Sequence, residues 1–391
     1  MYDEIIPLAK ELISIPSVSG DIEKAVEILE LAKQQLPGYA PTPFVSNNIP
    51  SLLFSNQGAE IRKFKIILNA HLDVVPATPE QFNPVEKNGK LYGRGAFDMK
   101  AAAAVKILLF KELAYKLSFP IALQLVMDEE TSGQNGTGYQ IQEGVRGKFV
   151  IIGECNSNFK VANKSKGRYT VRIKAKGKTS HSAYAWLGKN AIWRMYELLD
   201  PIVKAYPIAK TETHKTTVNI TKIESDNKAT NKIPDNCTAY LDIRYAPEDE
   251  NTIIEKIKSL LPSDAIVEAN RNRPYHFVDP ENSYISTLRS STLNVRGKEY
   301  PLRFAHATSD ATYFSAVGCD AIEFGPVGEG AHQDNEWVDI QSLYDYYQVL
   351  KNFLLELDGI TAETNLDLKI QYDPPFNQVF FEKIKSLFAR Q

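Results

Sequence analysis

Four short apolar stretches, each ending in a polar motif, constrain the fold of this chain most strongly. They lie at 65–70, 121–127, 149–152 and 321–324, and each has the length of a buried strand. A helix with an Ala-rich start is expected over 99–117, between the first two stretches. Helices that alternate with buried strands predict an α/β fold with a mixed, largely parallel sheet flanked by helices.

Two amphipathic helices are expected at the start of the chain. Ile5, Leu8 and Leu12 share one helical face. The second helix follows Asp21, whose carboxylate suits the N-cap position.

The length of the chain and a change of pattern in its middle predict two domains. A chain of 391 residues is long for one core. The elements expected in the middle are a strand over 171–176, a helix over 190–205, strands over 215–223 and 236–244, a helix over 249–261 and a strand over 264–270. This β-α-β-β-α-β order is that of the ferredoxin-like α+β unit. We therefore expect a small domain at 166–272, inserted into an α/β domain made of 1–165 and 273–391.

Composition excludes several classes of function. The 45 basic and 48 acidic residues give a net charge of -3, which provides no general attraction to nucleic acid or to an anionic membrane. No run of about 18 apolar residues suggests a membrane span, and the first residues lack the pattern of a signal peptide. The three cysteines are far apart and odd in number, so a disulfide framework is not expected. These features favour a cytoplasmic protein.

The apolar stretches lead into side chains of the types that bind metal ions. The five motifs are His71 in Asn-Ala-His-Leu-Asp, Asp98 in Gly-Arg-Gly-Ala-Phe-Asp-Met-Lys, Glu130 in Met-Asp-Glu-Glu, Glu154 in Gly-Glu-Cys-Asn and His332 in Gly-Ala-His-Gln-Asp-Asn-Glu. Two imidazoles and three carboxylates can hold two divalent ions if one carboxylate bridges them. Glu129, beside Glu130, is placed to move a proton. The set is that of a two-metal hydrolase.

Each motif also has a plainer structural interpretation. Asp98 alone could cap the following helix, the pair of glutamates could be a solvated turn, and a lone histidine is more often structural than a ligand. In an extended chain, however, Asp73 points to the same side as His71, where its carboxylate can accept the second imidazole N–H. A phosphate loop around Gly93 is dismissed because the third glycine is missing and Asp98 would repel a phosphate.

The five motifs in this order, with an inserted small domain, resemble the dinuclear zinc deacylases and exopeptidases. That family includes acetylornithine deacetylase, succinyl-diaminopimelate desuccinylase, aminoacylase and the glutamate carboxypeptidases, and the match covers nearly the whole chain. The resemblance implies two Zn²⁺ per chain, with Co²⁺ or Mn²⁺ as alternatives. One ion would be held by His71, Asp98 and Glu154, and the other by Asp98, Glu130 and His332. It also implies a cis peptide bond between Asp98 and Met99.

The resemblance extends to residues outside the metal motifs. It implies that His181 donates a hydrogen bond to the oxyanion, supplied by the lid domain of a partner chain; the alternative is an ordinary surface histidine. Arg244 would bind a substrate carboxylate through its guanidinium fork. Asn231 and Tyr184 would line the same pocket. Lys164, Lys166 and Arg168 are candidates for the second cationic pocket that a succinyl group requires.

Together these features predict a homodimeric dizinc amide hydrolase with a lid and dimerisation domain. Its substrates would be small N-acyl amino acids or short peptides, with no nucleic acid or membrane partner. Glutamate at position 154 resembles the deacylase and carboxypeptidase branches, so an N-acyl-amino-acid deacylase is expected and an exopeptidase is the alternative. Cys155 and Asn156 depart from the usual Pro-Thr pair and place a soft sulfur near the metals.

Two other classes of protein are disfavoured. A non-catalytic binding protein on the same fold would be expected to lack a metal ligand or the base, whereas all are present. A serine hydrolase would require a Gly-x-Ser-x-Gly motif or a comparable setting for its nucleophile, and none occurs.

Overall fold

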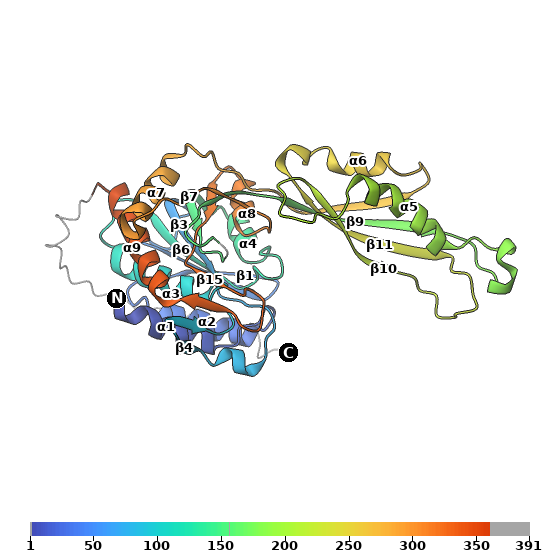
Figure 1. The fold of residues 1–391 in the computed structure, drawn as a ribbon. Coiled ribbons are helices and arrows are strands. Elements are labelled where there is room, and N and C mark those ends of the chain that lie inside the picture. The colour runs from blue at the N-terminus through green and yellow to red at the C-terminus, as the bar shows by residue number, and fades with distance from the viewer. Residues whose placement is uncertain (1, 156, 360–391) are drawn as a thin grey trace. The chain divides into compact units, whose positions relative to one another are not determined.

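The computed structural model describes residues 2–155 and 157–359, which form two compact units (Figure 1). The small unit consists of Lys164–His276 and Phe304–Thr308, and the other described residues form the large unit. The boundaries at 166 and 272 expected from the sequence remain a prediction. Asn156 and the tail after Gly359, whose role is not predicted, lie outside the described residues.

An eight-stranded sheet forms the centre of the fold, in the order β1-β2-β6-β3-β7-β14-β8-β13. Its strands are β1 (Thr42–Ser46), β2 (Ile49–Ser55), β3 (Lys63–His71), β6 (Ile121–Val126), β7 (Arg146–Ile152), β8 (Ala162–Ser165), β13 (Arg303–Ala305) and β14 (Asp320–Glu323). The four adjacent strands β6, β3, β7 and β14 are parallel. They are the strands expected from the apolar stretches, and the prediction of a mixed, largely parallel sheet flanked by helices is confirmed.

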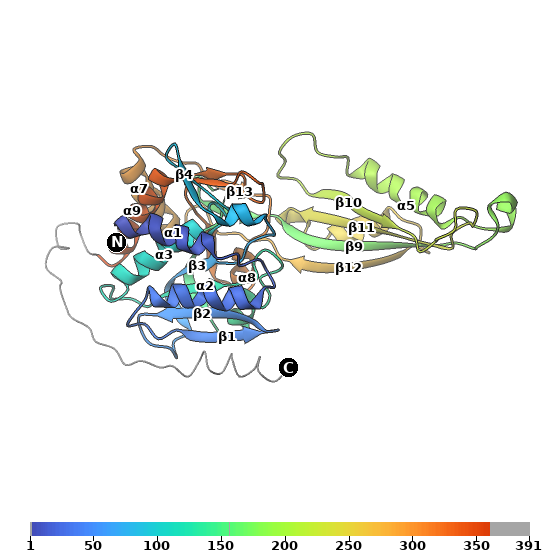
Figure 2. The same ribbon diagram turned by 90° about the horizontal axis from the view of Figure 1, so that it is seen from below.

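Helices cover both faces of this sheet (Figures 1 and 2). The helices of the large unit are η1 (Tyr2–Glu4), α1 (Ile5–Ser14), α2 (Ile22–Gln34), η2 (Pro79–Phe82), α3 (Lys100–Leu113), α4 (Thr137–Gln142), α7 (Ser283–Arg296), α8 (Ala311–Ser315) and α9 (Ile340–Leu357). The larger core joins α1, α2, α3, α7 and α9 to one face of the sheet, and a second core joins α4 and α8 to the other. Asp21 caps α2 as predicted, since its side chain accepts a hydrogen bond from Lys24 N at 3.1 Å.

Helix α3 packs against the central strands β3 and β6 in the larger core. Ala101, Ala102, Ala103 and Ala104 are fully buried, because their small side chains let the helix approach its neighbours closely. The helix starts one residue later than expected and ends earlier, at Leu113. The helix cannot extend as far as Pro120, because the proline ring disfavours helical backbone at Phe119.

A second, four-stranded antiparallel sheet of the large unit has no counterpart among the expected elements. Its order is β15-β16-β5-β4. The strands are β4 (Val85–Lys87), β5 (Lys90–Tyr92), β15 (Gly328–Glu329) and β16 (Trp337–Asp339). The connection between β15 and β16 carries His332.

The small unit has the ferredoxin-like arrangement that the sequence predicts. It consists of β9 (Gly167–Lys176), η3 (Ser182–Leu187), α5 (Ala191–Ala205), β10 (Thr217–Glu224), β11 (Asn236–Tyr245), η4 (Pro247–Asp249), α6 (Ile253–Ser259) and β12 (Ile266–Arg273). The sheet order is β10-β11-β9-β12, and every pair is antiparallel. Alternate residues of β9 and β11, such as Val171, Ile173 and Leu241, face the unit's own core.

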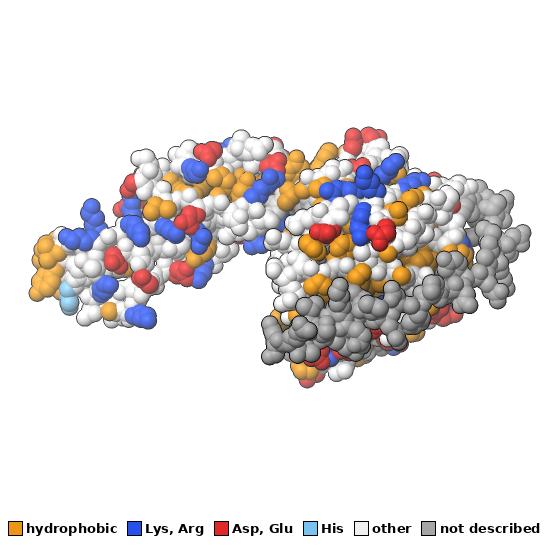
Figure 3. Space-filling view, turned by 180° about the vertical axis from the view of Figure 1, so that it is seen from behind, with side chains coloured by type: hydrophobic (Ala, Val, Ile, Leu, Met, Phe, Trp, Pro, Cys, Tyr) orange, Lys and Arg blue, Asp and Glu red, His pale blue; other side chains and the backbone are white. Residues whose placement is uncertain are grey.

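One face of the molecule carries charges of both signs (Figure 3). Figure 3 shows Lys and Arg side chains interspersed with Asp and Glu over one face of the molecule. Within residues 2–155 and 157–359, no helix combines the length and the apolar character that a membrane crossing requires.

Candidate metal centre

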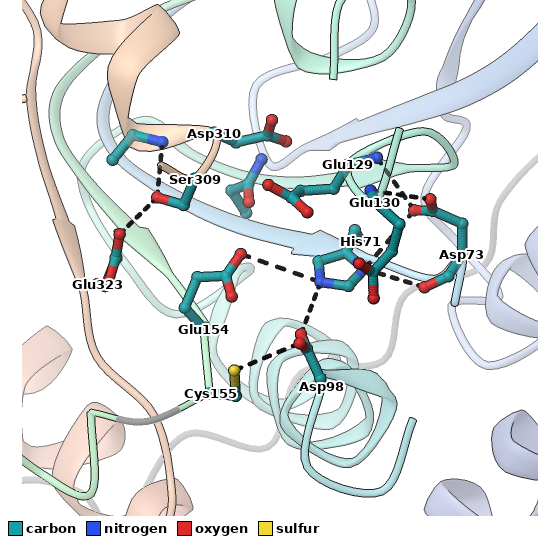
Figure 4. Close-up of polar contacts among 12 residues, drawn as sticks. His71, Asp73, Asp98, Glu129, Glu130, Glu154, Cys155, Ser309, Asp310 and Glu323 are labelled. Carbon is teal, nitrogen blue, oxygen red and sulfur yellow. Dashed lines mark hydrogen bonds and ion pairs between the residues drawn. The ribbon is translucent and has the colours of Figure 1, made fainter. Parts of the chain in front are cut away.

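Three neighbouring parallel strands end in polar side chains at the same edge of the large sheet. His71 is the last residue of β3, Glu129 and Glu130 follow β6, and Glu154 follows β7. Because β6, β3 and β7 are adjacent and parallel, their carboxyl ends bring these side chains together (Figure 4). This edge is where open α/β sheets bind their ligands.

Asp98 lies between the two candidate histidine ligands, with one carboxylate oxygen toward each. Its Oδ1 is 3.1 Å from Nε2 of His71, and its Oδ2 is 3.3 Å from Nε2 of His332. His332 Nε2 is also 2.9 Å from Glu130 Oε2, and His71 Nε2 is 3.9 Å from Glu154 Oε1. The arrangement places all five predicted ligands in one cluster and puts Asp98 in a bridging position.

The residues of the cluster fit divalent ions. Two N or O ligands about 2.0–2.1 Å from a tetrahedral ion lie roughly 3.3 Å apart, close to the separations around Asp98. Glu154 Oε1 is buried and has no hydrogen-bond partner among the described residues, although a buried carboxylate oxygen ordinarily requires one. A cation would supply that partner.

Electrostatics in the cluster also favour a cation. Burial, reinforced by the charges of Asp98 and Glu129, raises the pKa of Glu154 well above its ordinary value. Hydrogen bonds to Asp98 and Glu130 raise the pKa of His332 to about 10. Burial opposes the ionisation of Asp98, but hydrogen bonds from both imidazoles outweigh it and lower its pKa. The cluster therefore attracts positive charge, which protons or metal ions can supply.

Asp73 and Glu336 hold the segments that carry the ligands. The carboxylate of Asp73 accepts the backbone N–H groups of Glu129 and Glu130, each at 3.2 Å. The nearest acceptor for His71 Nδ1 is the backbone oxygen of Asp73 at 3.0 Å, while the carboxylate is 3.6 Å away. Asp73 thus orients the imidazole chiefly through its main chain, and its side chain positions the glutamates.

Glu336 holds the backbone of the segment that carries Asp98. Its carboxylate accepts hydrogen bonds from the backbone N–H groups of Gly95, Phe97 and Asp98 and from the guanidinium of Arg94, which is 2.6 Å away. Asp98 makes no side-chain cap to α3, so the capping interpretation of this residue is wrong. The peptide bond between Asp98 and Met99 is cis, as the family resemblance implies.

Glu129 lies beside the cluster, and His332 has an unusual backbone. Ligand atoms of Glu129, His71 and Glu154 lie within 4.8 Å of one another. The Glu129 carboxylate is therefore within reach of a water molecule at the centre. His332 has a φ of 64°, a left-handed conformation that non-glycine residues seldom adopt and that is frequent at functional sites.

The remaining predicted residues lie at opposite ends of the small unit's sheet. His181, Tyr184 and Asn231 are near one end: the His181 and Tyr184 rings are 5.9 Å apart, and Ser182 N donates to Asn231 O. Arg244 is at the other end of β11, where its Nε donates to Asp242 at 2.7 Å.

Arg244 lines a pocket of about 210 Å³ in the small unit. The other lining residues are Lys166, Glu212, Thr213, Thr217 and His306. Burial and the charge of Arg244 lower the pKa of Lys166, and both cations line this pocket. Glu212, His214 and His306 form a second group whose ligand atoms lie within 4.8 Å of one another.

Several supporting residues were not identified from the sequence. Glu336 lies in the His332 motif, four positions after that histidine. Its role depends on contacts with Phe97 and Asp98, about 240 residues earlier in the chain. Glu323 at the end of β14 accepts a hydrogen bond from Ser309 Oγ at 2.7 Å and is near enough to Glu154 to raise its pKa. A buried glutamate at a strand end was the only available signal for it.

Comparisons with known proteins agree with this architecture. A profile described as Peptidase family M20/M25/M40 matches residues 67–356. A succinyl-diaminopimelate desuccinylase of Marinobacter nauticus is 26% identical over 380 residues, covering 90% of this chain and 98% of that protein.

Solved structures share the fold. A tripeptidase from Staphylococcus aureus has a TM-score of 0.77 at 19% identity and covers 92% of this chain and 99% of its own. A dinuclear metal-binding peptidase of the M20 family from Bacillus subtilis has a TM-score of 0.66 at 13% identity, with coverage of 92% and 99%.

Proposed function

Because the chain belongs to peptidase family M20/M25/M40, we propose that it is a dizinc deacylase that hydrolyses the amide bond of N-acyl amino acids. The observation that carries the proposal is the convergence of two imidazoles and three carboxylates on one edge of the sheet, with Asp98 between the imidazoles. The desuccinylase relative supports a deacylase. A dizinc exopeptidase, such as a carboxypeptidase or dipeptidase, is the alternative.

The side chains divide between holding two ions and moving protons. We assign His71, Asp98 and Glu154 to one ion and Asp98, Glu130 and His332 to the other. Zn²⁺ suits this mixture of imidazole and carboxylate ligands, and Co²⁺ or Mn²⁺ could replace it. When bound, the ions would polarise the amide carbonyl and make a water molecule acidic.

Glu129 acts as the general base and acid in this scheme. It takes the proton of the attacking water and then delivers it to the nitrogen of the leaving amine, so that the amide bond yields a carboxylate and an amine. Asp73 keeps Glu129 in place through the backbone hydrogen bond at 3.2 Å. Such proton transfer typically contributes about 10²–10⁴-fold to the rate.

The substrate would be held by the small unit. Arg244 and Lys166 line one pocket, and two cations favour a carboxylate. His181 Nδ1 accepts a hydrogen bond from Ala183 N at 3.1 Å, so the ring proton of the neutral imidazole is on Nε2. That N–H is suited to stabilise an oxyanion, with Tyr184 and Asn231 nearby.

The distance between Arg244 and His181 within one small unit favours an active site to which two chains contribute. Along β9 and β11, the pairs Arg168–Arg244 and Lys176–Asn236 are eight positions apart, which is about 26 Å at roughly 3.3 Å per residue. A substrate of two residues spans only about 7 Å. One small unit therefore cannot bring Arg244 and His181 to the same substrate, and we propose that His181 acts in the site of a partner chain.

An exposed apolar face of the small unit is the proposed dimer interface. Helix α5 exposes Ile192, Trp193, Tyr196 and Val203 on the side away from its core, and Trp193 is 67% exposed. We place the enzyme in the cytoplasm, since its three cysteines form no disulfide.

Hydrolysis assays with a variant of the base test this function. Zinc-loaded protein is assayed with N-acetyl and N-succinyl amino acids and with dipeptides. We expect deacylation to exceed peptide cleavage, and Glu129→Gln to lower kcat about 10²–10⁴-fold with its metal content unchanged. Glu143→Gln, an exposed residue at the end of α4, is the matched control. A full rate in Glu129→Gln would contradict the mechanism, and faster cleavage of dipeptides would favour the exopeptidase.

A further inference from the structure

We infer that Cys155 is an additional ligand of the metal centre, which gives the site a soft, sulfur-containing donor set. This inference rests on the proposed dinuclear centre and extends it by one residue. Cys155 directly follows Glu154 at the end of β7 and is 8% exposed. Its thiol faces the bridging aspartate (Figure 4).

The position of the sulfur fits coordination. Cys155 Sγ is 3.3 Å from Asp98 Oδ2. With metal bonds of about 2.3 Å to sulfur and 2.0 Å to oxygen, two such ligands on one tetrahedral ion lie roughly 3.5 Å apart. Ligand atoms of Asp98, Glu154 and Cys155 all lie within 4.8 Å of one another.

A second observation points to a cation beside this sulfur. Glu154 is more than nine-tenths buried, and its Oε1 has no hydrogen-bond partner among the described residues. The acceptors near Cys155 are thus two carboxylates, and one oxygen of Glu154 has the His71 imidazole, 3.9 Å away, as a polar neighbour but no hydrogen-bond partner in the described part of the chain. The ion that we assign to His71, Asp98 and Glu154 would provide a partner for that oxygen. The thiolate of Cys155 would be a further ligand of the same ion, and the thiol would release its proton to solvent on binding.

A thiolate would change which metals the site prefers. Sulfur ligands select soft or borderline ions such as Zn²⁺ and Cd²⁺ over Mn²⁺. The alternative is that Cys155 only donates an S–H hydrogen bond to Asp98. The two roles differ in a measurable way, because only a metal–sulfur bond produces a thiolate-to-metal charge-transfer absorption.

Cobalt spectroscopy of the full-length protein tests the inference. The protein is stripped with a chelator, titrated with Co²⁺ and compared with Cys155→Ser by absorption. We expect ligand-field bands in both proteins, and a near-ultraviolet charge-transfer band in the wild type that Cys155→Ser lacks. Cys237→Ser and Cys319→Ser are matched controls: both cysteines are buried, neither belongs to a cluster of potential ligands in the described part of the chain, and both variants should keep the band.

Metal affinities provide a second readout. We expect Cys155→Ser to lower the affinity for Cd²⁺ about 10-fold or more, the scale of losses at metal sites, with a smaller loss for Mn²⁺. Ligand-field bands without a charge-transfer band in the wild type, or a band that survives in Cys155→Ser, would overturn the inference and leave the metal centre intact. A wild type without ligand-field bands would overturn the metal centre and this inference together.

Discussion

At the scale of single residues, the centre depends on how Asp98 is held. Glu336 fixes its backbone through three main-chain hydrogen bonds, and the two imidazoles lie against its carboxylate. A ligand held in this way loses little conformational freedom when an ion binds, which favours tight binding. The buried carboxylates around it are correspondingly costly when no cation neutralises them.

Glu323 should make the stability of the chelated protein depend on pH. Burial raises its pKa from 4.5 to about 7, although Ser309 donates a hydrogen bond to it. Between these values the unfolded chain has lost the proton and the folded chain retains it, so the free energy of unfolding falls as pH rises through this window. Glu323→Gln removes that titration. We expect the variant to gain stability relative to the wild type from about pH 4.5 to pH 7, and no further gain above it.

Urea unfolding at a series of pH values, in excess chelator, measures this difference. Glu143→Gln, which removes an exposed carboxylate, is the control and should follow the wild type closely. If the free energies of unfolding of Glu323→Gln and the wild type differ by the same amount from pH 4.5 to pH 7, the raised pKa of Glu323 is contradicted.

The motifs predicted the candidate ligands that the structure brings together, but not the contacts that support them. His71 ends an apolar strand and Glu154 follows another, which is a local signal. The contact of Glu336 with Phe97 and Asp98 joins residues about 240 positions apart, and no spacing in a single sequence reveals it. For Asp73, the geometry of an extended strand predicted that the carboxylate accepts the second N–H of His71, whereas the backbone oxygen of Asp73 is the nearer acceptor. The hydrogen bonds from the backbone of Glu129 and Glu130 to that carboxylate were not predicted.

At the scale of elements, the close approach of two strand ends positions Glu154. Gly325 follows β14, and a Cβ at this residue would lie 2.5 Å from the backbone oxygen of Glu154. Since neighbouring backbone cannot yield easily at that distance, Gly325→Ala should displace the Glu154 segment. We expect a loss of about 1–3 kcal/mol in the free energy of unfolding and at least a 10-fold loss of metal affinity.

Isothermal titration with Zn²⁺, together with urea unfolding, separates these two effects. Gly144→Ala is the control, because Gly144 has a φ of 92° and open space around it. That variant should lose about 1 kcal/mol of stability through its backbone and keep its affinity for Zn²⁺. Unchanged zinc affinity in Gly325→Ala would show that this contact does not position Glu154.

Elements were predictable in proportion to their length and burial. The central strands are buried on both faces, so they appear as uninterrupted apolar stretches. The strands β4, β5, β15 and β16 contain only two or three residues each, too few for a periodic pattern. The sheet that holds the His332 segment was therefore missed, although the motif itself was recognised.

At the scale of the whole molecule, the predicted family and an amide-hydrolysing activity are confirmed by the match to peptidase family M20/M25/M40. The family match also supports a hydrolase that binds metal ions. The choice of zinc and the assembly into a dimer remain proposals. They depend on ions and partner chains, whose positions a single sequence does not determine.

Mixing two inactive variants tests whether partner chains share a site. Glu129→Gln lacks the base, and His181→Ala lacks the proposed oxyanion donor. If His181 acts in the partner's site, a heterodimer of these variants contains one complete site. Because half of the dimers in an equal mixture are heterodimers, the mixture should recover up to about a quarter of the wild-type rate.

The matched control mixes Glu129→Gln with His332→Ala. Both changes lie in the large unit, so no site in the heterodimer is complete and the mixture should stay inactive. Equal activities in the two mixtures would contradict the contribution of His181 from a partner chain.

The measurement that tests the central claim most directly is the metal content of the purified protein after loading with Zn²⁺ and dialysis. The account predicts two ions per chain in the wild type, one in His332→Ala, and two in His214→Ala, which changes the second cluster of potential ligands in the small unit. A wild type that retains no zinc, or one that loses its ions with His214→Ala and keeps them with His332→Ala, would contradict the placement of the metal centre at the edge of the large sheet.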